Sequence, residues 1–134
     1  MRFSRRITII QVRRAKGESV NRDLQSFGSS LGLFNLRDKD KSCYRIFLEL
    51  LKAAKMKSGL ASDELAYTLG LTRGTVVHHL NKLMEAGIAV NERSKYYLRE
   101  ENLEVVIDSI RKDLESSMEE LRAVAKDIDE WMGL

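Results

Sequence analysis

Proline is absent from the 134-residue sequence, cysteine occurs once and histidine twice. Because proline ends or kinks helices, its absence is compatible with long uninterrupted helices. The single cysteine, Cys43, excludes a framework of intramolecular disulfides and is typical of the reducing cytoplasm, where we expect this chain to act. No run of 18 consecutive apolar residues occurs, so we expect no membrane-spanning helix. The first residues carry arginines but lack the sustained apolar run of a signal peptide.

Motifs of known catalytic sites are also absent. The sequence has no phosphate-binding glycine loop, no cluster of metal ligands and no grouping of a nucleophile with a base. Residues 28–32, Gly-Ser-Ser-Leu-Gly, lack the Gly-x-Ser-x-Gly spacing of a nucleophile elbow and are interpreted as a flexible connection. Three tyrosines could line a ligand pocket, although aromatic residues at such places usually belong to a core: Tyr67, Tyr96 and Tyr97. We therefore expect no enzymatic activity and no cofactor.

What the sequence does contain is an unequal distribution of charge. Residues 1–99 hold 19 Lys and Arg against 9 Asp and Glu, a net charge of +10. Residues 100–134 hold 4 against 11, a net charge of −7. A basic body attracts polyanions such as nucleic acids, whereas an acidic tail avoids them. An ordinary solvated surface with uneven charge is the plainer alternative.

The composition predicts three parts: a basic N-terminal arm over residues 1–39, a compact domain over residues 40–99 and an acidic helix over residues 100–134. Residues 7–12 of the arm are rich in β-branched side chains and therefore strand-like. We interpret them as a strand beside the domain's hairpin, a basic arm along DNA, or a segment exchanged between copies. We expect the arginines that flank this segment to contact phosphates. The alternative is that they serve only as gatekeepers, since arginines beside an aggregation-prone strand prevent aggregation. A short helix is predicted near residues 20–27.

Three helices are expected in the compact domain. The first covers residues 41–55, where large apolar side chains recur at helical spacing. Ser62 is predicted to cap a short second helix, which ends before Gly70. Thr72 is predicted to cap a third helix, which ends before Gly87, a residue that can take the left-handed cap conformation.

The second and third of these helices have the layout of a helix-turn-helix. On the third, Val76, Leu80 and Leu83 recur at i, i+4 and i+7 and predict a buried stripe. The opposite face carries polar, cationic and small residues: Thr72, Arg73, Gly74, Thr75, Val77, His78, Asn81 and Lys82. A hairpin around residues 92–94 is expected to follow as a wing, with Arg93 and Lys95 near its tip.

A helix with such a face can read DNA, because the early residues of a recognition helix reach base edges in the major groove. Arg73 is suited to guanine and Asn81 to adenine, while the methyl groups of Thr75 or Val77 can touch thymine. Gly74 lets the backbone approach the duplex, and the wing cations would contact phosphates or the minor groove. A generic helical hairpin with a solvated face is the alternative.

Residues 71–88, Leu-Thr-Arg-Gly-Thr-Val-Val-His-His-Leu-Asn-Lys-Leu-Met-Glu-Ala-Gly-Ile, resemble the winged helix-turn-helix of arsenic-repressor-like (ArsR-type) bacterial and archaeal regulators. The distinctive part is Thr-Val-x-His-His-Leu-x-Lys-Leu, and the resemblance covers about residues 44–98. It implies dimeric, sequence-specific binding to promoter DNA and marks these residues as groove-facing: Arg73, Gly74, Val77 and His78. Relatives often carry serine in place of Val77. The cysteine pairs and histidine clusters of metal-sensing relatives are absent.

His78 and His79 are adjacent, and no other histidine occurs. Neighbouring side chains on a helix point about 100° apart, so this pair cannot chelate one ion without distortion. Cys43 offers no second thiol, and we therefore expect no metal site. His78 is predicted to contact DNA, and His79 to pack or hydrogen-bond near the domain surface.

The acidic C-terminal segment follows a heptad pattern. Nine positions, spaced alternately by 4 and 3 residues, form one seam that is apolar except at Ser117: Leu103, Ile107, Ile110, Leu114, Ser117, Leu121, Val124, Ile128 and Trp131. This period of 3.5 residues predicts a coiled coil, most simply with a second copy of the chain. The alternative is a helix that folds back on its own domain.

These features predict a mainly α fold with a small β-hairpin (α+β), in which a winged helix-turn-helix domain precedes a long C-terminal coiled-coil helix. The predicted function is transcriptional regulation by a homodimer bound to double-stranded DNA at an inverted repeat, with recognition helices about 34 Å apart. The alternatives are an RNA-binding winged helix and a protein-interaction module with a coiled-coil docking stem. No effector molecule follows from the sequence.

Overall fold

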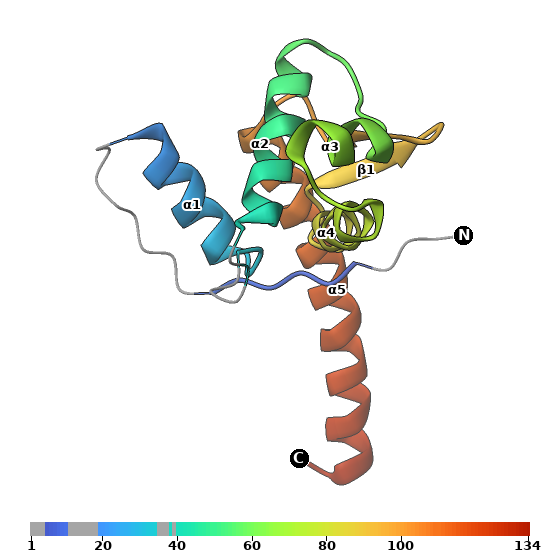
Figure 1. Cartoon of the computed structure of the whole chain (residues 1–134). Helices are drawn as coiled ribbons and strands as arrows, with labels where there is room; N and C mark the ends of the chain where they lie inside the picture. Colours follow the sequence, from blue (N-terminus) through green and yellow to red (C-terminus); the bar gives the residue numbers. More distant parts are fainter. Residues whose placement is uncertain (1–4, 11–18, 35–37, 39) are drawn as a thin grey trace.

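The structure, a computed structural model, describes residues 5–10, 19–34, 38 and 40–134. These residues form five helices and one hairpin: α1 (Val20–Ser30), α2 (Ser42–Lys55), α3 (Ser62–Leu69), α4 (Arg73–Glu85), β1 (Ala89–Glu92), β2 (Lys95–Leu98) and α5 (Leu103–Met132). Helices α1 to α4 and the hairpin make a body from which α5 projects (Figure 1). The predicted fold class, mainly α with one small hairpin and a long C-terminal helix, is confirmed.

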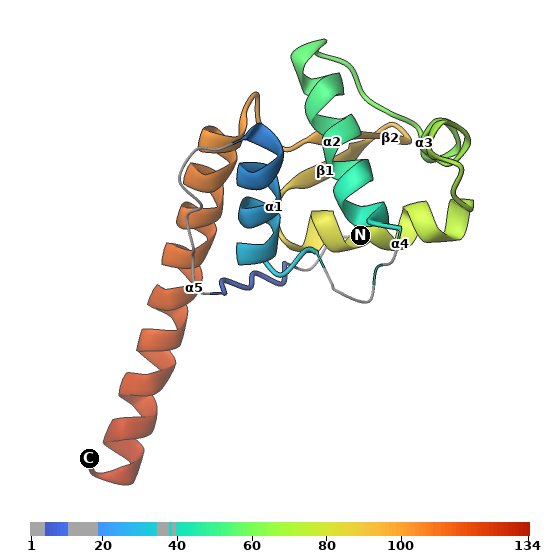
Figure 2. The same ribbon diagram turned by 60° about the vertical axis from the view of Figure 1, so that its left-hand side comes forward.

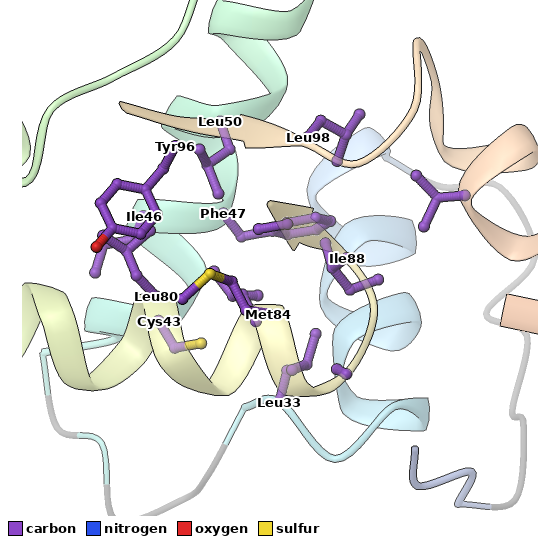
Figure 3. Close-up of a cluster of buried hydrophobic side chains, with 14 of the residues drawn as sticks. Leu33, Cys43, Ile46, Phe47, Leu50, Leu80, Met84, Ile88, Tyr96 and Leu98 are labelled. Atoms are coloured by element: carbon purple, nitrogen blue, oxygen red, sulfur yellow. The ribbon is translucent and has the colours of Figure 1, made fainter. Parts of the chain in front are cut away.

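One hydrophobic core joins α2, α4, the hairpin and the first part of α5 (Figure 3). Its centre is Phe47 of α2, which is 0% exposed. The ring of Phe27 on α1 stacks on that of Phe47 with centroids 6.0 Å apart, so α1 covers this side of the core. The helix predicted near residues 20–27 therefore exists, and it is longer than expected.

The starts of the helices show how local sequence sets their bounds. Thr72 caps α4 as predicted, since its Oγ1 accepts a hydrogen bond from the Thr75 amide at 3.1 Å. The prediction that Ser62 caps α3 is wrong by one residue. Ala61 takes the extended cap conformation, and Ser62 is the first helical residue. Two acidic residues in the first turn complement the helix dipole in place of a capping side chain.

Two left-handed glycines end the helices that flank the turn region. Gly70 has φ 66°, and the amide of Leu71 donates to the Ala66 carbonyl at 3.0 Å across the end of α3. Gly87 has φ 85° after α4, with the Ile88 amide donating to a carbonyl of the last turn at 3.0 Å. Both are Schellman-type endings, in which glycine takes the left-handed position without a steric penalty.

The hairpin is antiparallel, and Glu92 pairs with Lys95 at its tip. Glu92 therefore belongs to β1, and the turn consists of Arg93 and Ser94 rather than of residues 92–94. Next to its tip, the Leu60 amide donates to the Tyr96 carbonyl of β2 at 2.9 Å, and the Leu60 carbonyl accepts from the Tyr96 amide at 2.8 Å. This bridge fixes the hairpin to the segment between α2 and α3.

The strand expected at residues 7–12 does not form over residues 7–10, and residues 11 and 12 lie outside the described residues. Residues 5–10 pass instead along the ends of two helices. The Arg6 amide donates to the Glu85 carbonyl at 2.8 Å, and the Ile10 amide donates to the Ser30 carbonyl at 2.7 Å. Carbonyls at helix ends thus replace the neighbouring strand that β-branched residues usually pair with.

The long helix α5 has two unlike halves (Figure 2). In the first half Val106 is 0% and Ile110 is 3% exposed, and Leu103, Ile107 and Leu114 pack against the same core. From residue 115 onward every residue is exposed. The fold-back alternative therefore describes the first half, while the second half extends beyond the body and is not covered by any other described part of the chain.

Candidate nucleic-acid interface

The orientation of α4 is set by its inner stripe. Val76, Leu80 and Leu83 are each 0% exposed, as predicted. Three side chains that span almost the whole helix and are fully buried leave α4 one orientation, so its opposite face is turned to solvent. Arg73, Gly74, His78 and Asn81 are exposed on that face, and Thr75 and Val77 are half-buried beside them: the predicted set is brought together with one exception.

The exception is Lys82. Its Nζ donates to the Leu33 carbonyl at 3.0 Å, and the residue is half-buried. The ammonium group therefore ties α4 to the segment that follows α1, and the expectation that it faces DNA does not fit this position.

The beginning of α4 presents Arg73 on an open surface. Its Nε lies 3.5 Å from Oδ1 of Asp63 on α3, with both side chains about three-quarters exposed at 73% and 78%. An exposed ion pair of this kind contributes little stability, so Arg73 can leave it for another acceptor. The hydroxyl of Thr72 donates to Oγ1 of Thr75 at 2.8 Å. The two hydroxyls are therefore engaged in capping α4. The methyl group of Thr75 is the part of this side chain that remains for contact with DNA.

Gly74 lies in the first turn of α4, and a Cβ atom built on it would have no heavy atom within 4 Å. The fold therefore does not require glycine at this place. The space beside its backbone is open to solvent, and a duplex could approach it closely.

The two histidines of α4 differ, as expected. His78 is exposed, whereas His79 is half-buried, and their rings meet edge to face with centroids 5.3 Å apart. Nδ1 of His79 is buried and has no hydrogen-bond partner among the described residues. Burial, with His78 and Lys82 adding to it, holds the pKa of His79 below its ordinary value of 6.5, and Asp38 opposes this shift. His79 is therefore a packing residue that is neutral at neutral pH.

The wing carries its two cations at the tip. Arg93 and Lys95 are exposed, and Arg93 and Ser94 form the turn with φ of 53° and 66°. Positive φ at both turn residues matches the twist of a hairpin but normally favours Asn-Gly. Arg93 thus has a strained backbone conformation. Strained residues of this kind are common at functional sites.

Tyr67 is a candidate contact that sequence reasoning missed. It lies on α3 and is 92% exposed. Asp63 stands one helical turn earlier and therefore on the same face, and Asp63 reaches Arg73 of α4. Tyr67 consequently shares a surface with the start of α4. The spacing of the buried Leu65 and the half-buried Leu69 already places Tyr67 on the outer face of α3 and could have identified it.

An ionic cluster joins the N-terminal segment, the segment that follows β2, and α5. Asp113 of α5 accepts hydrogen bonds from Nη1 and Nη2 of Arg99, which follows β2, at 2.8 and 3.3 Å. Nε of Arg5 lies 3.5 Å from the same carboxylate, and its Nη1 donates to the Met84 carbonyl of α4 at 3.0 Å. Arg5 is thus engaged within the chain rather than free for a phosphate. Of the other arginines in the arm that were predicted to contact phosphate, Arg6 is exposed, whereas Arg2, Arg13 and Arg14 lie outside the described residues.

The predicted dimerisation residues are divided between two environments. The first four, Leu103, Ile107, Ile110 and Leu114, pack against the chain's own core. The last four remain exposed, by 62% at Leu121, 54% at Val124, 53% at Ile128 and 88% at Trp131. Only the second group is free for contact with another molecule.

Two further findings concern the described residues alone. They include no group of three or more His, Cys, Asp and Glu side chains placed to hold a metal ion. None of their helices is both long enough and apolar enough to cross a membrane.

Comparison with known proteins agrees with this geometry. Residues 40–93 match a family described as "Helix-turn-helix domain". The match covers α2, α3, α4, β1 and the first residue of the turn, and leaves out the N-terminal segment with α1, the strand β2 and α5. Neither the curated proteins nor the solved structures gave a match. The part of the chain that carries the exposed face of α4 is therefore a helix-turn-helix domain.

Proposed function

We propose that this chain is a sequence-specific transcriptional regulator that binds double-stranded DNA as a homodimer on an inverted repeat in the cytoplasm. We assign it to the ArsR-type winged helix-turn-helix regulators, in a variant that senses no metal and has no enzymatic activity. The observation that carries this function is α4: its inner stripe is fully buried, and its outer face is polar, cationic and open.

Base readout is assigned to the exposed face of α4. Arg73 sits in the first turn, where recognition helices reach base edges, and its guanidinium can bond O6 and N7 of guanine. Asn81 lies two turns further and offers the amide pattern suited to adenine. The Thr75 methyl and Val77 provide apolar contacts between them, and the open backbone at Gly74 permits close approach.

The wing is assigned to backbone contact. Arg93 and Lys95 extend from the body at the hairpin tip, and cations at such a tip bind phosphates or enter the minor groove. The cationic body and the acidic stem fit this arrangement, because residues 100–134 with their charge of −7 stay away from the duplex.

The homodimer is assigned to the exposed half of α5. Burying a large apolar side chain fully is worth about 1.5–3 kcal/mol, and each copy offers four at the seam. The free energy gained by burying eight such side chains, four from each copy, exceeds the lower part of the free-energy cost of association, which is about 4–15 kcal/mol. Two copies then present two α4 helices, and two-fold symmetry makes the target an inverted repeat.

The test compares the affinity of the full chain for duplex DNA, single strands and double-stranded RNA. Duplex fragments selected from genomic DNA should bind most tightly, and Arg73→Ala should weaken this binding by about 1–3 kcal/mol and relax the preference at one base pair. Arg122→Ala, an equal loss of charge on the exposed stem, is the matched control and should bind as the unchanged protein does. Tighter binding to RNA, or equal losses for the two variants on every sequence, would contradict the proposed function.

A further inference from the structure

The exposed half of α5 is asymmetric across its seam. On one flank, the residues that directly follow Ser117, Val124 and Trp131 are apolar: Met118, Ala125 and Met132. The residues that directly precede Leu121 and Ile128 on the other flank are acidic, Glu120 and Asp127. All of them are exposed. An apolar seam with one apolar and one acidic flank can therefore distinguish between the two ways in which a second helix can lie on it.

The two orientations bring different flanks together. In a parallel pair the flank before the seam of one helix faces the flank after the seam of the other, whereas in an antiparallel pair like flanks meet. A parallel pair sets Glu120 against Ala125 of the partner subunit and Asp127 against Met132 of the partner subunit. An antiparallel pair brings acidic flanks together, so that Glu120 or Asp127 meets Asp127 of the partner subunit. Like charges at such short range disfavour pairing.

From this asymmetry we infer that the occupant of the seam is a second copy of α5, in parallel and in register over residues 115–132. An anionic membrane and a nucleic acid fit poorly, because residues 100–134 carry a charge of −7. A second copy tolerates this charge, since parallel pairing keeps the acidic flank next to apolar side chains and turns the remaining charges outward.

Parallel pairing has a consequence for DNA recognition, and this step rests on the proposed function. Both bodies then leave the stem at the same end, with the two-fold axis along the stem. The two α4 helices can approach the spacing of about 34 Å that adjacent half-sites require. In an antiparallel pair, the bodies would stand at opposite ends of a segment that is roughly 27 Å long at 1.5 Å per residue, and the widths of the bodies would add to this separation.

Disulfide trapping in the full-length protein tests the orientation, with two neighbouring serines as a matched pair. Ser117 lies on the seam and Ser116 points about 100° away, and both are exposed. The native Cys43 does not compete, because it is 1% exposed and burial raises the pKa of its thiol to about 11. In a parallel pair the two Cβ atoms of Ser117→Cys meet near the axis at a separation that suits a disulfide.

Ser117→Cys should therefore oxidise to a covalent dimer roughly a hundredfold faster than Ser116→Cys, because only the thiols at position 117 meet across the axis, where pairing raises their effective concentration toward the millimolar range. A chain that sediments as a dimer, but whose two variants oxidise at the same rate, would overturn the parallel orientation. A chain that sediments as a monomer at all accessible concentrations would overturn the self-pairing as well. DNA binding is measured separately, so a cross-linked Ser117→Cys dimer that ignores duplex DNA refutes the proposed function but leaves the stem in place.

Discussion

Two isoleucines on one seam of α5 should respond to the same substitution in different ways. Ile110 is 3% exposed and belongs to the core cluster, and a Cβ atom at Gly87 would come within 3.2 Å of its Cγ1. Replacing a buried isoleucine by alanine costs about 2–5 kcal/mol, since the cavity adds to the lost transfer free energy. A domain of this size has a total stability of about 5–15 kcal/mol. Ile110→Ala should therefore remove a large part of the free energy of unfolding.

Ile128 is 53% exposed, in the half of the helix that lies beyond the body. Ile128→Ala should change the free energy of unfolding of the single chain by less than about 0.5 kcal/mol, as exposed substitutions usually do. It should instead weaken dimerisation. Urea denaturation at low protein concentration measures the first quantity, and sedimentation equilibrium over a range of concentrations measures the second.

The comparison is decisive because residue type and helix are the same for both variants. Equal losses of unfolding free energy for Ile110→Ala and Ile128→Ala at low concentration would refute the division of α5 into a core half and a free half. Unchanged dimerisation in Ile128→Ala would refute the assignment of the free half to self-association.

The same division determines which truncation can test dimerisation. Deletion of residues 103–134 removes Val106 and Ile110 from the core, so it should unfold the domain rather than merely yield monomers. Deletion of residues 116–134 leaves every packed residue of α5 in place. That shorter variant should keep the melting behaviour of the body and lose only self-association.

Three further predictions concern the body. Gly74→Ala should stabilise the free chain by up to about 1 kcal/mol, since a helical glycine is replaced without a clash. The same variant should weaken duplex binding, because the added methyl group fills the space through which the duplex approaches the backbone. A titration that shows unchanged affinity for the duplex would contradict close approach at Gly74. Tyr67→Ala should weaken duplex binding by about 1.5–3 kcal/mol equally on all sequences, because a hydrogen bond to a charged phosphate is lost. The melting temperature of the protein should stay constant. A loss of affinity that depends on the DNA sequence would instead mean that Tyr67 contacts bases. Because the pKa of His79 is lower in the folded chain than its ordinary value of 6.5, the unfolded chain binds the proton more tightly, so stability is complete above pH 6.5 and declines as pH falls toward the folded pKa. Denaturation at pH 7.5 and 5.5 should show a smaller decline in His79→Gln than in the unchanged protein, and equal declines would contradict the role of His79.

The sequence predicted best those features that are encoded by neighbouring residues. Thr72 and Gly70 act at the positions expected of them, because caps and left-handed ends depend on residues within one turn. Ser62 was misplaced by one residue, since an alanine with extended dihedral angles can start a helix whose acidic first turn complements the dipole. Neighbouring residues thus predict which helices form, and they place the ends of these helices to within about one residue.

Features that depend on distant residues were not predictable. Lys82 shares the polar face of α4 by its spacing, but its ammonium group binds the Leu33 carbonyl, 49 residues away in the chain. The heptad spacing of α5 continues from Leu103 to Trp131, with Ser117 as its one polar position. The surroundings of this seam nevertheless change from the chain's own core to solvent near Leu114. A periodic pattern shows which face of a helix is apolar, and only tertiary structure shows what covers it.

Selection of bound sequences from a library of random duplexes tests sequence-specific binding through α4 most directly. The full chain should enrich an inverted repeat whose half-sites are centred about 10–10.5 base pairs apart, and Arg73→Ala should lose the preference at one base pair of each half-site. Recovery of a pool without any enriched sequence, at a salt concentration where the chain still binds duplex DNA, would contradict sequence-specific recognition.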